Sequence, residues 1–175
     1  MRSIYLSIFA LLLSGCTTYQ NQNIVGKNFP SVYGQNLEQK TLQLPNDFKG
    51  KQTLLLIAYK HKSQFDVDRW LIGLDMTETK IDAYEIPTLQ GMFPEMFRPF
   101  IDNGMRKGIP KELWKGVVTV YGDGEAVQSF TGNENPTNAR VVLIDKQGVV
   151  TYFYDRGFSV SALNELRTVI EENQP

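Results

Sequence analysis

The sequence contains a single cysteine, Cys16, and a single histidine, His61. A disulfide within the chain needs two cysteines, and a structural zinc site needs about four cysteine or histidine ligands, so the composition excludes both. Neither sign of charge is in excess, because 18 Lys and Arg stand against 19 Asp and Glu. A nucleic-acid-binding domain usually carries a basic excess, so we expect no nucleic-acid partner. The sequence shows no cofactor-binding motif, so we expect no cofactor.

The overall composition is that of a folded domain. Apolar residues make up 42% and charged residues 21% of the 175 residues. These fractions are typical of soluble globular chains, and the length suits one domain of ordinary size.

Charge is missing from the N-terminal region, where Arg2 is the only charged residue before Lys27. The apolar run over residues 4–13 is about ten residues long, which fits a signal peptide and is too short to cross a bilayer as a helix. The next segment, Leu13-Ser14-Gly15-Cys16, resembles the bacterial lipobox at every position. An ordinary signal peptide with a chance cysteine is the alternative interpretation.

The lipobox resemblance implies cleavage before Cys16 and attachment of acyl chains, such as palmitate, to that residue. We therefore expect a signal peptide over 1–15, a lipidated tether over 16–26 and a folded domain over 27–175. Several acyl chains on one residue give stable membrane anchoring. Thr17 follows the cysteine. An Asp there would resemble an inner-membrane retention signal, so we expect the outer membrane of a bacterial cell envelope, facing the periplasm.

Strand and helix patterns alternate along the rest of the chain. The expected strands cover 42–44, 53–59, 80–86, 116–121, 140–145 and 149–154, and the expected helices cover 63–74, 94–107 with a break at Pro99, 124–131 and 159–172. Ser63 with Asp66 forms a capping box that starts the first helix, and Trp70 lies on its buried stripe. The order predicts an α/β fold with a mainly parallel central sheet, a C-terminal antiparallel hairpin and helices on both faces.

This order resembles the thioredoxin-like fold, in its peroxiredoxin-type form. The resemblance is carried by Phe29-Pro30, by the turn over 48–51 and by the hairpin over 142–150. Residues 29–158 also resemble the mitochondrial assembly-factor family for the membrane sector of ATP synthase, on the spans 44–70 and 108–110.

Two departures from the thioredoxin pattern bear on function. The resemblance places a reactive cysteine after the first core strand, where a helix N-terminus favours the thiolate, but this stretch is Lys60-His61-Lys62-Ser63-Gln64. The position of the thioredoxin cis-proline falls on Ala139. We therefore expect neither disulfide exchange nor thiol peroxidation by the mechanism of that family.

The sequence favours a non-enzymatic binding or assembly module held at the membrane through Cys16, with a protein partner. The candidate contact residues are Lys60, His61, Lys62, Ser63 and Gln64, with Trp114 beside them; a solvated loop is the alternative. An enzyme with a non-thiol site around Lys60–Gln64, or a domain that binds the thiols of a partner, would be the other functions. The apolar residues over 92–105 fit either an adaptable binding surface or, as we prefer, a helix packed on the sheet.

Overall fold

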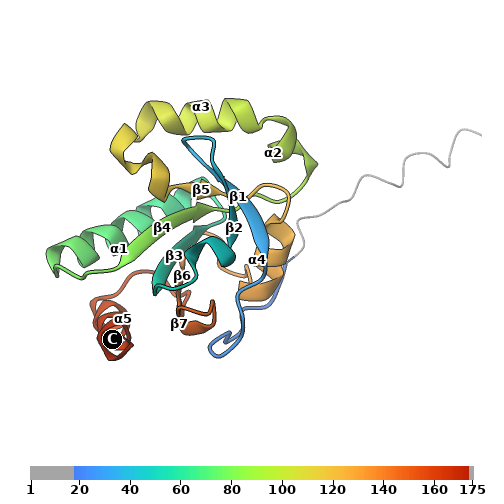
Figure 1. Ribbon diagram of the computed structural model, residues 1–175. Coiled ribbons are helices and arrows are strands. Elements are labelled where there is room, and N and C mark those ends of the chain that lie inside the picture. The colour runs from blue at the N-terminus through green and yellow to red at the C-terminus, as the bar shows by residue number, and fades with distance from the viewer. Residues whose placement is uncertain (1–17, 174–175) are drawn as a thin grey trace, which may run out of the picture.

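The strand β3 (Thr53–Ala58) lies at the centre of the computed structural model, which describes residues 18–173 (Figure 1). Leu54 to Ile57 are completely buried. Such a strand needs cover on both faces, and neighbouring elements supply it. The apolar run over 53–59 therefore predicted the central strand correctly.

The central sheet has the strand order β4–β3–β6–β7. It is built from β3 together with β4 (Asp82–Pro87), β6 (Arg140–Ile144) and β7 (Val150–Tyr154). The predicted C-terminal hairpin is β6–β7. Only β3 and β4 are parallel, and the other two pairings are antiparallel, so parallel pairing is a smaller share than we expected. The connection over 88–139 returns the chain to the carboxyl end of β3, where Arg140 faces Ile57, and β6 runs back from there.

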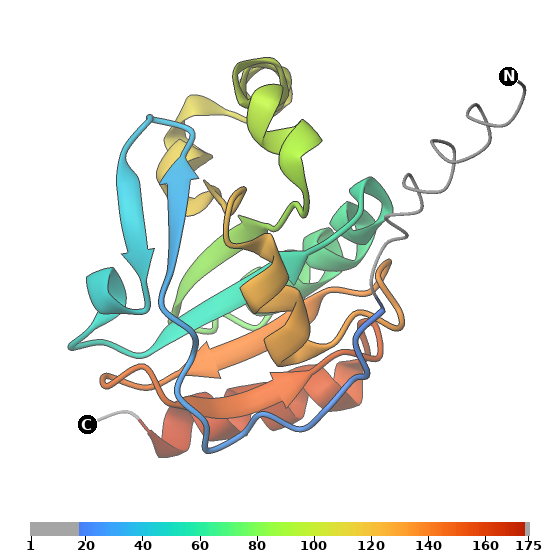
Figure 2. The same ribbon diagram turned by 90° about the vertical axis from the view of Figure 1, so that its right-hand side faces the viewer.

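Helices cover both faces of this sheet (Figure 2). The helices α1 (Gln64–Met76) and α5 (Val160–Glu172) pack on one face, where Trp70 and Leu166 are completely buried against Leu54 and Leu56. The helix α4 (Gly124–Thr131) packs on the other face through Val127. The sequence predicted the last helix from its cap, and the Ser159 hydroxyl accepts the backbone N–H of Ala162 at 3.1 Å.

A smaller sheet lies on the α4 side of the molecule. Its order is β2–β1–β5, from β2 (Thr41–Leu44), β1 (Val32–Asn36) and β5 (Val118–Thr119). The strand expected over 116–121 is thus mostly a set of single bridges, in which Val117 and Val120 pair with Glu85 and Thr88 of the β4 region. Three helical turns complete the fold: η1 (Asn46–Phe48), η2 (His61–Ser63) and η3 (Lys111–Gly116).

The predicted break in the 94–107 helix is present. The chain forms α2 (Met92–Met96) and α3 (Arg98–Gly108), and Pro99 lies in the first turn of α3. Proline is tolerated there because the N–H groups of a first turn have no partner within the helix. Within residues 18–173, no helix combines the length and the apolar character needed to cross a membrane.

Residues 19–26, which we call the strap, belong to the stretch expected as the lipidated tether and follow the surface of the domain (Figure 2). The backbone N–H of Asn133 donates to the Tyr19 carbonyl at 2.9 Å, and that of Gly26 donates to Val150 at 2.8 Å. Ile24 is completely buried in the core. The proposed cleavage point and Cys16 lie outside the described residues.

Candidate functional site

The loop that carries the predicted contact residues lies at the carboxyl end of β3 and leads into α1. Lys60, His61, Lys62 and Gln64 are exposed, whereas Ser63 is completely buried. The carboxyl end of a central strand is where open α/β sheets bind ligands. The exposed cations therefore occupy the place predicted for them, and Ser63 does not belong to their surface.

Ser63 holds the loop against the segment that precedes β6. Its hydroxyl donates to the Pro136 carbonyl at 2.9 Å and accepts the backbone N–H of Lys60 at 3.3 Å. It makes no cap to α1. The predicted capping box is therefore wrong, because the Ser63 hydroxyl is used by a residue distant in the sequence.

Asp66, the other half of the predicted capping box, has a similar long-range role. Its two oxygens accept the backbone N–H groups of Phe158 at 2.7 Å and Ala139 at 2.8 Å. Asp66 is only 7% exposed. Hydrogen bonds to a buried carboxylate are among the stronger ones in proteins. Asp66 therefore fixes α1 to Ala139, the position expected for the cis-proline, and to the start of α5.

A polar cluster borders the loop on the β4 side. The Gln64 amide donates to the carboxylates of Asp68 at 2.9 Å and of Glu85 at 3.0 Å. Burial raises the pKa of Glu85, the Gln64 hydrogen bond opposes this, and the negative charge of Asp68 raises it further. Glu85 is thus a carboxyl group that holds its proton more readily than an exposed one.

The structure does not bring Trp114 together with this loop. Trp114 precedes β5, whereas the loop follows β3. The strand β4 is parallel to β3, and Val117, just before β5, pairs in parallel with Glu85 of β4, so all three segments run in the same direction. The two sites therefore lie at opposite ends of the strands. The indole N–H of Trp114 donates to the Ile109 carbonyl at 2.9 Å, so the ring closes the turn after α3.

The helices α2 and α3 leave apolar side chains in solvent. Met96, Phe97 and Phe100 are 64%, 54% and 80% exposed. The helix α3 is held through Asp102, which accepts the Tyr121 hydroxyl at 2.7 Å. Our preferred interpretation, a helix packed on the sheet, is wrong for these three residues, because α3 contacts the domain mainly through its opposite side.

Sequence reasoning missed Arg140, whose side chain is completely buried. Its guanidinium donates to the carbonyls of Gly132, Asn135 and Asn138 at 3.1, 2.6 and 2.8 Å. It also lies 4.9 Å from the centre of the Tyr59 ring. Burial lowers the pKa of Arg140, and burial raises the pKa of Tyr59 to about 12. The signal in the sequence was one charge at the start of an otherwise apolar strand.

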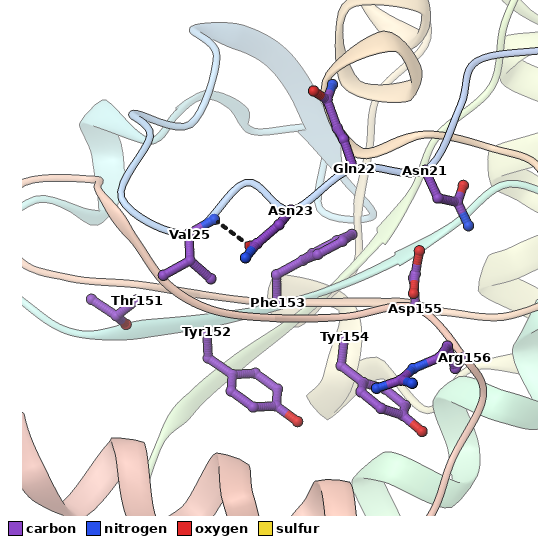
Figure 3. Close-up of a pocket in the computed structure, with 10 residues that line it drawn as sticks. All are labelled: Asn21, Gln22, Asn23, Val25, Thr151, Tyr152, Phe153, Tyr154, Asp155 and Arg156. Atoms are coloured by element: carbon purple, nitrogen blue, oxygen red, sulfur yellow. Dashed lines mark hydrogen bonds between the residues drawn. The ribbon is translucent and has the colours of Figure 1, made fainter.

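A groove of about 450 Å³ lies between the strap and β7 (Figure 3). Asn21, Gln22, Asn23 and Val25 line one side and residues 151–156 the other. Figure 3 shows Tyr152 and Tyr154 directed away from the strap; the Tyr152 hydroxyl donates to the Ala162 carbonyl of α5, and the Tyr154 ring packs against Trp70 of α1. The groove therefore presents few converging functional groups. Nowhere in the described chain do three His, Cys, Asp or Glu side chains gather as a metal site would need.

Comparison with known proteins shows which fold the chain has. No protein-family model and no curated protein matches the chain. Among solved structures, the thioredoxin domain of a Bacteroides vulgatus thiol-disulfide oxidoreductase is similar, with a TM-score of 0.55 and 18% identity over 85% of this chain and 99% of that chain. The chain thus has a thioredoxin-like α/β fold, as predicted.

Two further structures are similar to the same extent. A SCO1/SenC family lipoprotein from Bacillus anthracis has a TM-score of 0.54 and 14% identity over 88% of this chain and 99% of that chain. BsSco, a member of the Sco family of cytochrome c oxidase assembly proteins, has a TM-score of 0.54 and 12% identity over 88% of this chain and 97% of that chain. At these identities the likeness concerns the fold alone.

Proposed function

We propose that this protein is a membrane-anchored lipoprotein whose redox-inactive thioredoxin-like domain acts as a non-enzymatic binding or assembly factor in the bacterial cell envelope. The observation that carries the proposal is the loop after β3. It holds Lys60, His61 and Lys62 in solvent and a buried Ser63, and the sequence has no cysteine after Cys16. Disulfide exchange and thiol peroxidation both need a thiolate, so the domain has no group for either reaction.

The anchor in this proposal is a lipid on Cys16. Its support is the lipobox pattern Leu13–Cys16, and two structures of similar fold are lipoproteins. The Thr17 that follows the cysteine favours the outer membrane, with the domain in the periplasm. Acyl chains including palmitate would then hold the protein at the membrane surface.

The assembly role has two supports. Residues 29–158 resemble the assembly-factor family for the membrane sector of ATP synthase, and BsSco, which has a similar fold, belongs to a family of cytochrome c oxidase assembly proteins. The contact surface we assign to this role is the loop Lys60–Gln64. Its exposed cations would attract an acidic partner and make its binding sensitive to salt.

Two measurements test the proposal. Cys16→Ser should abolish incorporation of radiolabelled palmitate, and Thr18→Ser, a matched control, should leave it intact; palmitate in the Cys16→Ser protein would contradict the anchor. The purified chain should neither reduce a disulfide substrate nor consume a peroxide. Turnover of either substrate, retained by Cys16→Ser, would overturn the non-enzymatic role.

The binding role is tested by capture of partners from membranes of the native host. Lys60→Glu with Lys62→Glu should weaken capture at low salt, while Lys111→Glu with Lys115→Glu, at the opposite end of the strands, should not. Exposed charges contribute little to stability, so both double variants should fold normally. Equal capture by the two variants would move the contact surface elsewhere.

One observation favours an enzyme with a non-thiol site as the second candidate. The Glu85 carboxyl has a raised pKa, and its neighbour Gln64 belongs to the candidate loop. A carboxyl of this kind suits general acid or base catalysis. If such a reaction is found, Glu85→Gln should abolish it, and Glu171→Gln, a change of an exposed residue on α5, should not.

A further inference from the structure

The strap begins close to the proposed lipid anchor. Tyr19 follows Cys16 by three positions in the sequence. At full extension three residues span about 10 Å, so a lipid on Cys16 would keep Tyr19 within roughly that distance of the headgroups. Whatever part of the domain holds Tyr19 must then lie close to the membrane.

The segment that holds Tyr19 is the turn between α4 and β6. Tyr19 and Asn133 exchange hydrogen bonds: the Tyr19 N–H donates to the Asn133 side chain at 2.7 Å, and the Asn133 N–H donates to the Tyr19 carbonyl at 2.9 Å. The next pair is similar, because the Asn21 N–H donates to the Glu134 carboxylate and the Glu134 N–H donates to the Asn21 side chain. The strap is therefore joined to residues 133–134 by four hydrogen bonds.

Interactions from the core make this junction rigid. Arg140 donates to the carbonyls on both sides of the junction, at Gly132 and Asn135, and its remaining nitrogen lies 3.4 Å from the Asn21 side-chain oxygen. The strap passes close to Gly132, because a Cβ atom there would lie 2.4 Å from the Asn21 Cα atom. The orientation of the domain relative to Tyr19 is thus set by packing and by buried hydrogen bonds.

The turn between α4 and β6 also contacts the loop that contains Lys60 and Lys62. Pro136, three positions after Asn133, accepts the hydroxyl of Ser63, the residue that ends the loop turn η2. Lys60, His61 and Lys62 therefore lie at the end of the domain at which the strap begins. Figure 2 shows the start of the strap beside the turn that follows α4, away from the β6–β7 hairpin turn.

We propose that the end of the domain formed by Lys60–Lys62 and Asn133–Pro136 faces the membrane that holds the anchor, and that Lys60 and Lys62 contact anionic phospholipid headgroups. The inference rests on the proposed lipid on Cys16. It takes the membrane surface as the acidic partner of the loop, in place of the acidic protein considered above, so the two assignments of Lys60 and Lys62 are alternatives that the tests below separate. The short link favours lipid over a protein, because a surface held this near the headgroups meets them first. Glu134 is exposed at the same end and would repel anionic headgroups, so the contact is assigned to Lys60 and Lys62 alone.

The orientation is tested with the full, lipidated chain in vesicles. The sequence has no cysteine after Cys16, so a cysteine introduced there is the single site for a thiol-reactive fluorophore. Thr137→Cys places the label beside Pro136, and Gln147→Cys places a matched label in the hairpin turn at the other end of β6; both residues are exposed. A nitroxide on the lipid headgroups should quench the first label at least about twofold more than the second.

Equal quenching, or stronger quenching of the Gln147→Cys label, would overturn the orientation. Palmitate incorporation into the same two variants separates this failure from failure of the anchor. A palmitate-labelled chain without the difference leaves the anchor in place, whereas an unlabelled chain refutes the anchor and the orientation with it.

The headgroup contact is tested by charge. In the Thr137→Cys protein, quenching should be stronger in vesicles with phosphatidylglycerol than in vesicles of phosphatidylcholine alone. Lys60→Glu with Lys62→Glu should remove this difference, and Lys111→Glu with Lys115→Glu should preserve it. Equal quenching in the two kinds of vesicle would overturn the contact. So would cross-linking of the Thr137→Cys site to an acidic protein, at full yield, in native membranes.

Discussion

The Asp66 carboxylate near the start of α1 accepts the backbone N–H of Ala139, 73 residues further along the chain, at 2.8 Å. Its other oxygen accepts the N–H of Phe158 before α5. Three segments that are distant in the sequence therefore meet at one buried side chain. In this thioredoxin-like domain the contact keeps the start of α1 and the segment before β6 in place.

Asp66→Ala should lower the free energy of unfolding by about 3 kcal/mol, because it leaves two backbone N–H groups without their charged acceptor. The measurement is urea unfolding at neutral pH. Asp75→Ala, which changes an exposed aspartate on the same helix, should alter stability by less than about 0.5 kcal/mol. Similar effects of the two substitutions would show that the Asp66 contacts contribute little.

Trp70→Ala should lower the free energy of unfolding by about 3–5 kcal/mol, because the ring is completely buried between α1, β7 and α5. Its centroid lies 5.8 Å from that of Tyr154 and 5.3 Å from that of Phe158. In the described chain the indole N–H of Trp70 has no hydrogen-bond partner, so Trp70→Phe should cost much less.

Ile72→Ala is the control for Trp70, since Ile72 lies on the same helix and is 57% exposed. It should leave the melting temperature nearly unchanged. A melting temperature that Trp70→Ala also leaves unchanged would contradict the burial of the ring.

Glu85 should make stability depend on pH. Burial raises its pKa in the folded state above the ordinary value of 4.5, so between those two pKa values the folded protein binds more protons than the unfolded chain. Stability is then lost as pH rises through that window. Glu85→Gln should remove this loss, so the variant gains stability over the wild type as pH rises above 4.5.

Urea unfolding at several pH values measures the effect of Glu85. Glu171→Gln, on the exposed side of α5, should keep the wild-type pH profile. A Glu85→Gln profile that is parallel to the wild type would show that the carboxyl does not titrate abnormally.

The parts of the fold that the sequence predicted are those with a local pattern. The apolar run of β3, the stripe with Trp70 and the Ser159 cap all depend on residues within one or two turns of each other. The placement of Lys60–Lys62 followed from the same pattern, because a loop after a buried strand lies at the end of the sheet. No such pattern placed Trp114, whose position depends on β5 pairing beyond β4.

Long-range polar contacts explain the errors. Ser63 and Asp66 have the spacing of a capping box, but their side chains form hydrogen bonds with Pro136 and Ala139. These partners are 73 residues away in the sequence, so no local sequence pattern predicts them. Most of the strap is polar and all of it is uncharged, which is typical of a tether, and its attachment depends on Asn133 and Arg140. Hydrogen bonds between such distant residues leave no periodicity in the sequence.

The attachment of the strap also depends on the backbone at Gly132. Its φ of 77° lies in the range that favours glycine. A Cβ atom at this position would lie 2.4 Å from the Asn21 Cα atom and 2.6 Å from the Gln20 carbonyl oxygen. Gly50 has a similar φ of 89°, but a Cβ atom there would meet nothing within 4 Å. Of these two glycines, only Gly132 combines a positive φ with a close approach to the strap.

Gly132→Ala should displace the strap, whereas Gly50→Ala should cost only the backbone strain of about 1–2 kcal/mol. The expected result is faster amide hydrogen exchange over residues 19–26 in Gly132→Ala, because the hydrogen bonds of Tyr19 and Asn21 to residues 133–134 are lost. Exchange over the same residues in Gly50→Ala should match the wild type once corrected for global stability. Protection that survives in Gly132→Ala would mean that Arg140 and the buried Ile24 hold the strap without help from a close approach at Gly132.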